Sequence, residues 1–458
     1  MKVLVQIKEA KNGKFSEILL IFNDLNGKEQ NVSLILNKFI DIYDLTKDTK
    51  SIKFDFFLIS ALVYGIDNLL DREYYSHDGW SREIDVVLPV YNISNWTGQE
   101  LLLEEALNFL TGDNWKIQFK HNSVQNCFLE KRRRWNKNRR NFNSEKIKVT
   151  SLFSGGLDSL IGVIDQLEKL DNGEEILLVS HFDFNSSGPN RDQQKLFSSL
   201  AKKYPDKIKN NWIQTRLALS RSNIYGEKMK IEGNYRSRSF FFIGLGCFLS
   251  PSSNLIIPEN GTISINYPLT PSRVSSLSTR TTHPFVVSKI QALLSNLDIS
   301  VDLDNPYCFK TKGEMVRECL NSDFLDEVYS KSTSCGKSNH KENWEVKTGT
   351  YHCGVCMPCI YRRAALHKNQ NDDQLYGNYI EKAIYRNKYV DLPALINYLK
   401  RKIDLEEMKR DILVNGSVPM DDLEEYAKMV MRSKDEVLQL FKDKGNKFIK
   451  SELGIHDN

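Results

Sequence analysis

The chain has 458 residues, which is enough for two or three domains with hydrophobic cores of their own. Lysine and arginine number 63 against 59 aspartates and glutamates, and this net charge of +4 argues against a protein that coats nucleic acid. Hydrophobic residues make up 40% of the chain, which excludes wholesale disorder, and the longest apolar stretch, Phe240 to Leu249, is too short to span a bilayer. Because no signal peptide is visible and the eight cysteines are too sparse for a disulfide scaffold, we expect a soluble cytoplasmic protein.

Residues 1–145 are predicted to form an N-terminal α+β accessory domain. Short β-branched or alternating apolar runs are typical of strands, and longer apolar runs without proline are typical of buried helices. These patterns predict strands at residues 3–7, 18–22, 84–88 and 115–119 and helices at residues 54–70 and 101–110. Asn12-Gly13 marks a hairpin turn between the first two strands. None of these elements points to an activity.

A basic run follows, Lys131 to Arg140, with seven positive side chains around Trp135. Clustered arginines bind phosphates, so contact with RNA, a nucleotide or an acidic partner is one interpretation. A solvated segment between two domains is the other interpretation, and it is favoured because the composition of the chain changes here.

Residues 146–370 have the pattern of a parallel α/β domain. Strands are expected at residues 149–153 and 176–179 and helices at residues 160–170 and 191–203. Residues 371–458 are charged, helix-periodic and poor in glycine, which predicts a helical C-terminal region. The predicted fold class is therefore α/β, with a parallel sheet flanked by helices, an extra α+β N-terminal domain and a helical C-terminal appendage.

The turn after the first of these strands, Ser154-Gly155-Gly156-Leu157-Asp158-Ser159, is the sharpest signal in the sequence. Two glycines let the backbone turn tightly and approach a phosphate closely, because no Cβ stands in the way. Backbone N–H groups at the start of the following helix favour an anion, and the two serines add hydroxyl donors. Asp158 is unfavourable beside bare phosphates but suits a Mg²⁺ ion that bridges them. The loop lacks the lysine of a Walker A motif, which disfavours an ordinary P-loop ATPase.

Four of the eight cysteines lie within 25 positions of one another. Cys353, Cys356 and Cys359 form a tight knuckle, and Cys335 lies upstream of it. Four thiolates without an open position predict a structural, tetrahedral Zn²⁺ site. An iron–sulfur cluster is the competing interpretation, and a reduced, metal-free group is the third.

The loop resembles the PP-loop of the N-type ATP pyrophosphatases, which cleave ATP between the α- and β-phosphates and adenylate an oxygen of their substrate. Together with the cysteine spacing C-x17-C-G-x-C-x-x-C, it resembles the QueC family, the 7-cyano-7-deazaguanine synthases. Further points of resemblance are Arg236 and Arg238 before an apolar helix, the segment Lys310-Thr-Lys-Gly-Glu-Met315, and Arg362 after the last cysteine. The resemblance extends over residues 147–370.

This resemblance implies ATP, Mg²⁺ and Zn²⁺ as cofactors and 7-carboxy-7-deazaguanine as substrate. The substrate carboxylate would attack the α-phosphate, and an amine would capture the acyl adenylate as an amide. In QueC itself the amine is ammonia, and a second ATP-dependent step yields a nitrile. The catalytic candidates are Asp158, Lys310 and Lys312. The nucleotide-binding candidates are Ser154, Gly155, Gly156, Asp158, Ser159, Asp183, Arg236 and Arg238, and the metal-ligand candidates are Cys335, Cys353, Cys356 and Cys359.

The length of the chain points to a subgroup, because QueC chains are usually much shorter. The chain resembles the longer QueC-like proteins of bacterial anti-phage defence systems, such as QatC of the Qat system and the QueC homologue associated with CBASS. The segments that carry this resemblance are residues 80–83, 108–113, 258–261, 266–269 and 278–284. The resemblance implies transfer of the activated acid to an amine of a partner protein, and its substrate-pocket candidates are Glu259, Asn260, Arg273, Arg280 and His283. No membrane contact is expected, RNA contact is not favoured, and a homodimer is left open.

Two alternatives stay open from the sequence. A tRNA-modifying PP-loop enzyme would use the basic run to hold RNA, although the near-neutral net charge weakens this interpretation. An iron–sulfur cluster in place of zinc would favour the tRNA-modifying enzyme. The second alternative is a catalytically idle nucleotide-binding subunit of a defence complex, against which the intact Ser154, Asp158 and Ser159 argue.

Overall fold

The computed structural model of the protein describes residues 1–8, 17–37, 39–124, 142–182, 187–220, 222–223, 225–233, 236–267, 280–338, 341–369, 372–380 and 391–455. Its strands are β1 Lys2–Lys8, β2 Glu17–Asn23, β3 Glu29–Asn37, β4 Glu83–Val90, β5 Asn114–His121, β6 Ile147–Leu152, β7 Glu175–His181, β8 Trp212–Leu219, β9 Asn254–Ile256 and β10 Asp302–Asp304. They form a ten-stranded sheet in the order β10-β9-β6-β7-β8-β3-β2-β1-β4-β5. Most neighbours are parallel, and antiparallel pairing joins β8 to β3, β3 to β2 and β2 to β1.

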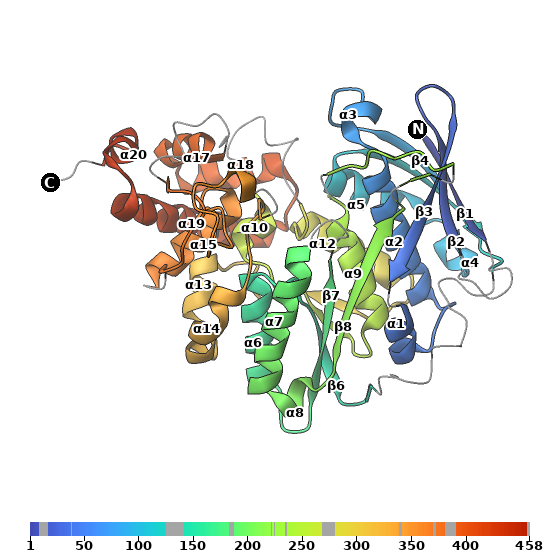
Figure 1. The fold of residues 1–458 in the computed structure, drawn as a ribbon, viewed down its shortest axis with the longest axis horizontal. Coiled ribbons are helices and arrows are strands. Elements are labelled where there is room, and N and C mark those ends of the chain that lie inside the picture. The colour runs from blue at the N-terminus through green and yellow to red at the C-terminus, as the bar shows by residue number, and fades with distance from the viewer. Residues whose placement is uncertain are drawn as a thin grey trace.

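Helices flank this sheet and form the C-terminal end of the molecule (Figure 1). Those of the first half are α1 Phe39–Thr46, α2 Ile52–Leu69, α3 Arg72–Tyr75, α4 Ile93–Trp96, α5 Glu100–Thr111, α6 Leu157–Lys169, α7 Ser187–Lys203, α8 Pro205–Ile208 and α9 Arg238–Leu249. Those of the second half are α10 Gly261–Ile265, α12 Pro284–Asn296, α13 Lys312–Arg317, α14 Ser322–Val328, α15 Met357–Lys368, α17 Asp391–Lys400, α18 Leu405–Asn415, α19 Leu423–Lys444 and α20 Lys447–Glu452.

Both faces of the sheet are buried at β7. Along β7, Leu177 and Val179 belong to the apolar core that contains α2 and α9, whereas Ile176 and Leu178 belong to the core that contains α6. A strand with helices on both faces is apolar over most of its length, and the apolar run Ile176 to Val179 at the centre of β7 predicts this strand. The predicted α/β class, a largely parallel sheet flanked by helices, is confirmed.

The N-terminal strands extend the same sheet. β3 pairs with β8 in antiparallel register, with Leu34 opposite Leu219, and one apolar core reaches from Val3 in β1 to Leu255 in β9. Helix α2 is buried on nearly every side and packs along α9. The predicted domain boundary at residue 145 stays a prediction, and the residues on its two sides share a sheet and a core.

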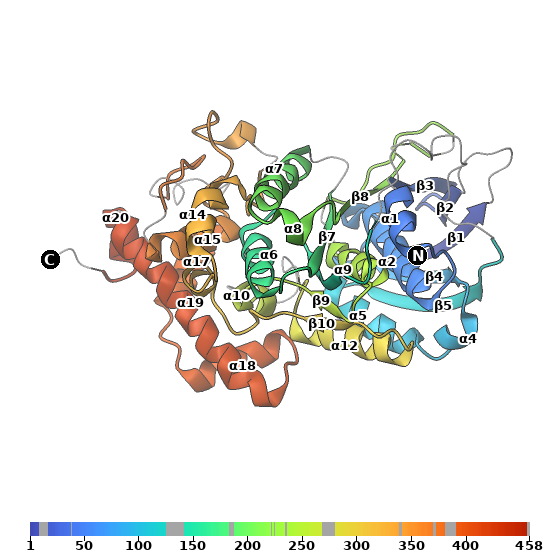
Figure 2. The same ribbon diagram turned by 90° about the horizontal axis from the view of Figure 1, so that it is seen from below.

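A third apolar core holds the helices of the C-terminal end together, from α15 to α20. These helices lie at the opposite end of the molecule from β1 and β5, as two perpendicular views show (Figures 1 and 2). Across the described stretches, every helix is too short or too polar to cross a lipid bilayer.

Candidate functional site

The order of the strands changes direction beside β6. From β6 the chain proceeds to β7 and β8 on one side, and it then crosses to β9 and β10 on the other side. In open α/β sheets, ligands bind outside the carboxyl ends of the strands at such a switch point. The segment after β6 carries the loop Ser154–Ser159, and the segment after β9 carries Glu259 and Asn260. The switch point therefore brings two groups of predicted site residues to the same edge.

The loop Ser154–Ser159 has the conformation that its glycines predict. Gly155 has a φ of +89°, and a Cβ at this position would lie 3.1 Å from Gln193 Cγ. Gly156 is the N-cap of α6, so the first N–H groups of the helix adjoin the loop. The Ser154 hydroxyl donates to Ser159 Oγ at 3.1 Å and accepts from the Gly156 N–H at 3.3 Å. Two hydroxyls thus lie at the start of a 13-residue helix, an arrangement that suits an anion.

Asp158, in the first turn of α6, is the centre of a buried polar cluster. Lys312 Nζ donates to Asp158 Oδ1, and Asn260 Nδ2 donates to Asp158 Oδ2 at 2.7 Å. All three residues are buried. Lys312 begins α13, 154 positions after Asp158, so the fold brings two of the predicted catalytic residues into contact.

Glu259 contacts the same cluster, where its Oε1 accepts from Asn260 Nδ2 at 3.4 Å. Burial raises the pKa of Glu259 well above its ordinary value, and the neighbouring charge of Asp158 raises it further. Burial also acts to raise the pKa of Asp158, but the charge of Lys312 and the hydrogen bonds to Asp158 lower it overall. The pKa values of the two carboxyl groups are therefore shifted in opposite directions, that of Glu259 upward and that of Asp158 downward.

Two glycines let the segments of this cluster approach each other. Gly162, in the second turn of α6, faces Pro258, and a Cβ there would lie 2.4 Å from Pro258 Cβ. The Gly261 N–H donates to the Lys310 carbonyl oxygen at 2.8 Å, and a Cβ on Gly261 would lie 2.2 Å from the Cys308 carbonyl oxygen. The segment after β9 is therefore held between α6 and the segment that leads to α13.

The four predicted metal ligands, Cys335, Cys353, Cys356 and Cys359, lie together. Their Sγ atoms are all within 4.8 Å of one another, with 3.8 Å between those of Cys353 and Cys359 and 4.0 Å between those of Cys335 and Cys356. Tetrahedral zinc with Zn–S bonds of about 2.3 Å separates its sulfurs by about 3.8 Å, so the donor set fits this ion. The group could hold a metal ion such as zinc, with all four positions taken by protein.

Backbone N–H groups point at these sulfurs. Cys353 Sγ accepts from the N–H groups of Val355 and Cys356, at 3.5 and 3.3 Å. Cys335 Sγ accepts from those of Lys337 and Cys353, at 3.4 and 3.3 Å. The neighbouring thiols, Cys335 first, lower the pKa of Cys353. Hydrogen bonds to sulfur stabilise the thiolate form that a metal requires.

The cysteine cluster adjoins the loop. Ser334 precedes Cys335, and its Oγ accepts a hydrogen bond from the Leu157 N–H at 3.3 Å. The N–H of Thr333 donates to the Gly155 carbonyl oxygen at 3.0 Å. Thr333 and Ser334, which directly precede Cys335, therefore bond to the backbone of Gly155 and of Leu157.

Arg362, in α15 after the last cysteine, supports this segment from the protein interior. It is fully buried, and its guanidinium donates to Ser332 Oγ and to the Tyr329 carbonyl oxygen, each at 2.8 Å. His352 Nε2 accepts from the Ser334 N–H at 3.3 Å. The cysteine segment and the loop are thus parts of one hydrogen-bonded unit.

Lys310 has a different environment from that of Lys312. Its Nζ pairs with Glu318 at 3.0 Å, and the two side chains are 39% and 42% exposed. Lys312 has a side chain that is 7% exposed and pairs with Asp158. Of the two lysines in the predicted segment, Lys312 is therefore the one that the fold places in the buried cluster.

Arg236 and Arg238 lie at the start of α9. A guanidinium N–H of Arg236 donates to the Thr111 carbonyl oxygen, and the guanidinium carbon lies 3.5 Å from the centre of the Trp80 ring. Arg238 is the first residue of α9. These two contacts of Arg236 are with the N-terminal region, and the roles of the two arginines as nucleotide ligands stay predictions.

Arg280 and His283 lie beside Phe109. The Arg280 guanidinium donates to the Phe109 carbonyl oxygen at 3.1 Å. His283 is the N-cap of α12, where its Nδ1 accepts from the Phe285 N–H at 3.2 Å. Burial, and after it the charge of Arg280, lowers the pKa of His283 to about 3, so the imidazole is neutral near pH 7. The substrate-pocket candidates that the structure describes therefore fall into two groups, one at the Asp158 cluster and this one beside Phe109.

Four features singled out in the sequence lie outside the described residues, namely Asp183, Arg273, the basic run Lys131–Arg140 and the Asn12-Gly13 turn. The residues that support the loop were not predicted. Besides Thr333 and Ser334, they include Gln193, whose Nε2 donates to the Ser154 and His181 carbonyl oxygens at 3.1 Å each. Such residues are common on protein surfaces, and the position of Ser334 next to a cysteine was the one local signal.

No protein-family model, curated protein or solved structure matches the chain. The functional conclusion therefore depends on what the site can do chemically. The described residues offer a loop suited to an anion, a carboxyl pair beside a buried lysine, and a four-cysteine group attached to the loop.

Proposed function

We propose that this chain is a QueC-like, ATP-dependent enzyme of bacterial anti-phage defence. It adenylates the carboxylate of 7-carboxy-7-deazaguanine and then forms an amide with an amine, either ammonia or an amine of a partner protein. The observation that carries the proposal is the loop Ser154–Ser159 at the switch point of the sheet, with Asp158, Lys312 and Glu259 gathered beside it.

The loop supports the nucleotide part of the proposal. Phosphate oxygens accept hydrogen bonds, and the hydroxyls of Ser154 and Ser159 together with the N–H groups at the start of α6 are donors in one place. Lys312 adds a buried positive charge, which is worth more to a phosphate in the interior than in water.

The carboxyl pair supports a divalent cation. Asp158 and Glu259 offer oxygen ligands, which Mg²⁺ prefers together with phosphates. A cation between the two groups would offset the repulsion from Asp158 that raises the pKa of Glu259. Mg²⁺, when bound, neutralises charge that develops on the phosphates during transfer.

The proposed reaction has two balanced steps. A carboxylate oxygen of the substrate bonds to the α-phosphorus of ATP, the bond from that phosphorus to the bridging oxygen breaks, and pyrophosphate leaves. The amine nitrogen then bonds to the acyl carbon, the bond from that carbon to the AMP oxygen breaks, and AMP leaves with that oxygen. The amine loses one proton to water or to a carboxylate. The contact of Lys312 with Asp158 supports a role for this lysine in stabilising phosphate charge, and the bond from Leu157 to Ser334 supports a role for the cysteine segment in holding the loop.

The test is an isotope experiment on purified protein. ATP, Mg²⁺, ammonium and 7-carboxy-7-deazaguanine with ¹⁸O in its carboxylate are incubated with the wild-type chain, and AMP and pyrophosphate are measured. The proposal predicts AMP that carries one ¹⁸O, because the carboxylate oxygen stays on phosphorus. Asp158→Asn is predicted to lose AMP formation, while Lys310→Met keeps it if Lys310 acts only in its surface ion pair.

Three results decide among the interpretations. AMP without ¹⁸O contradicts attack by the carboxylate. Absence of AMP with ammonia and with every candidate partner protein favours the idle nucleotide-binding subunit. A deazaguanine-sized mass addition on a coexpressed partner protein, lost with Asp158→Asn, identifies a protein amine as the acceptor.

A further inference from the structure

Helix α19, in the C-terminal region, contacts the segment that carries Lys312. Glu436 in α19 is buried, and its Oε1 accepts from the Thr311 hydroxyl at 2.6 Å. Its Oε2 accepts from the Gly313 N–H at 3.3 Å. A Cβ on Gly313 would lie 2.4 Å from Glu436 Oε1, so glycine allows this approach. Glu436 therefore bonds to the residues immediately before and after Lys312.

A second residue of α19 holds the same turn. Arg432 lies one helical turn before Glu436, and its Nε donates to Glu314 Oε1 at 2.7 Å. Its Nη2 donates to the Phe309 carbonyl oxygen at 2.9 Å. Glu314 in turn accepts from the Thr311 N–H at 2.8 Å and completes the capping box that starts α13. The first turn of α13 is thus capped by its own side chains and clamped by α19.

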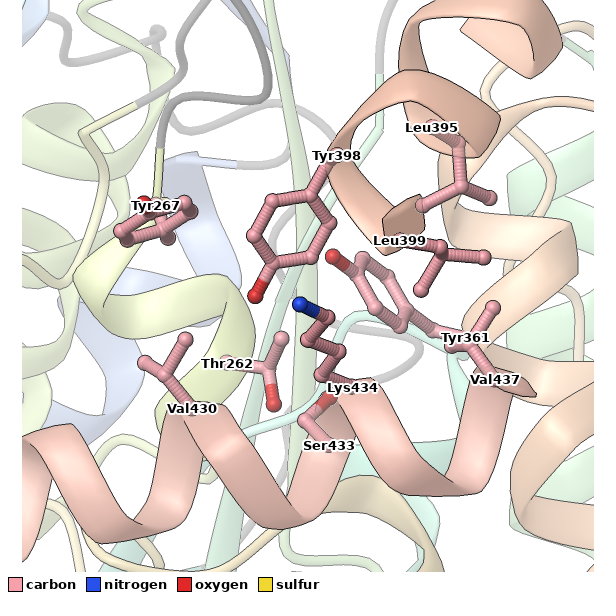
Figure 3. A pocket seen from close by; sticks show the side chains of 10 residues that line it. All are labelled: Thr262, Tyr267, Tyr361, Leu395, Tyr398, Leu399, Val430, Ser433, Lys434 and Val437. Atoms are coloured by element: carbon pink, nitrogen blue, oxygen red, sulfur yellow. The ribbon is translucent and has the colours of Figure 1, made fainter. Parts of the chain in front are cut away.

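Helix α19 is packed against other helices of the C-terminal half. Its Val430, Ser433, Lys434 and Val437 line a small pocket with side chains from α10, α15 and α17 (Figure 3). The hydroxyl ends of Tyr361 and Tyr398 and the Lys434 ammonium point toward one another there (Figure 3). One side of α19 is therefore packed against three other helices, and the side that carries Arg432 and Glu436 meets α13.

We infer that Glu436 and Arg432 are positioning residues, which hold Lys312 against Asp158 through the first turn of α13. The catalytic meaning of this clamp rests on the proposed function, whereas the clamp itself does not. The clamp makes helix α19 part of the site, because it fixes the turn that carries Lys312. If the Lys312 ammonium moved away from Asp158, a buried charge would be left unpaired.

The test uses the full-length chain and two independent readouts. The first is the rate at which an amine-reactive label modifies Lys312, measured by peptide mass spectrometry. The second is kcat and KM for AMP formation. The variants are Glu436→Ala, Glu436→Gln and Arg432→Leu. The matched control is Lys428→Ala on the same helix, because Lys428 pairs with the exposed Glu424 and Glu425.

Labelling of Lys312 is expected to rise several-fold in Glu436→Ala and Arg432→Leu. It should stay near the wild-type rate in Lys428→Ala and in Glu436→Gln, whose amide oxygen still accepts from Thr311. For Glu436→Ala we expect kcat to fall by about tenfold to a hundredfold with KM for ATP unchanged, since the loss is one of geometry. Circular dichroism verifies that each variant is folded, and Arg432→Leu carries the test if Glu436→Ala does not fold.

Wild-type labelling of Lys312 in folded Glu436→Ala and Arg432→Leu overturns the inference. A fall in kcat without a change in labelling also overturns it, because the effect would not pass through Lys312. If the wild-type chain makes no AMP but labelling changes as expected, the clamp stands and the proposed function fails.

Discussion

The Ser334 hydroxyl accepts a hydrogen bond from the Leu157 backbone N–H, with 3.3 Å between the two atoms. Leu157 begins α6, and Ser334 is the residue before Cys335, so this bond connects the glycine loop to the cysteine cluster. The two residues are 177 positions apart. Folding of the four-cysteine segment therefore helps to decide the shape of the loop.

Replacing Cys356 with serine removes one of four thiolates, and we expect the metal to be lost. The wild-type protein should carry about one zinc per chain by elemental mass spectrometry, and the Cys356→Ser protein far less. Because Ser334 then loses its support, amide hydrogen exchange at residues 154–159 should become faster. Loop protection that stays unchanged after metal loss would contradict the coupling.

The control for this experiment is Cys308→Ser, because Cys308 lies outside the four-cysteine group. It should retain zinc and loop protection. If the purified wild-type protein is brown and oxygen-sensitive, the four cysteines hold an iron–sulfur cluster in place of zinc. That result would strengthen the tRNA-modifying alternative.

Lys312→Met should destabilise the protein substantially, because it leaves the Asp158 carboxylate buried without its cation. The side chains of this pair are 7% and 9% exposed. Removing one partner of a buried pair costs about 3–5 kcal/mol, and we expect the lower end because Asn260 still bonds Asp158. Urea unfolding provides the measurement. The double variant Lys312→Met with Asp158→Asn should regain part of the loss.

Lys310→Met is the matched control for that change. The ion pair of Lys310 with Glu318 is at the surface. Removal of this pair should therefore lower the free energy of unfolding by less than about 1 kcal/mol. If the two lysine variants lose equal free energies of unfolding, the Lys312–Asp158 pair is not a buried, unscreened interaction in solution.

Glu259→Gln should change how stability depends on pH. The pKa of Glu259 is raised above its ordinary value of 4.5, first by burial and then by Asp158. At a pH between 4.5 and the raised pKa, Glu259 has lost its proton in the unfolded chain but retains it in the folded chain. The stability of the wild-type protein therefore falls as the pH rises through this range. The variant lacks this penalty, so its thermal midpoint should gain on that of the wild type between about pH 5 and about pH 8. A difference that stays constant or shrinks with pH contradicts the raised pKa.

Gly162→Ala should push α6 away from the segment after β9. The new Cβ would lie 2.4 Å from Pro258 Cβ, and overpacking of this kind costs about 1–3 kcal/mol against a helix-propensity gain of about 1 kcal/mol. We expect a net loss in urea unfolding and weaker Mg²⁺-dependent ATP binding by calorimetry. Gly233→Ala is the control, because nothing lies within 4 Å of a Cβ built at that position. Equal effects of the two changes would rule out the steric explanation.

Much of the fold was predictable because its signals are local. The expected strand at residues 149–153 corresponds to β6, and the expected helix at residues 160–170 corresponds to α6. α6 begins earlier than expected, at Leu157, because Gly156 serves as its N-cap. Helix α2 matches the apolar run at residues 54–70, since an uninterrupted apolar helix is buried on nearly every side.

The sequence by itself determined the loop Ser154–Ser159 and the knuckle of Cys353, Cys356 and Cys359, because each depends on residues a few positions apart. The tertiary structure alone decided that Asp158 pairs with Lys312 and not with Lys310, that Glu259 joins them, and that Ser334 connects the loop to the cysteines. These contacts join residues more than a hundred positions apart. They depend on which strands become neighbours at the switch point and on which side of α13 meets α6. Local patterns of polarity and turn residues do not specify either of these.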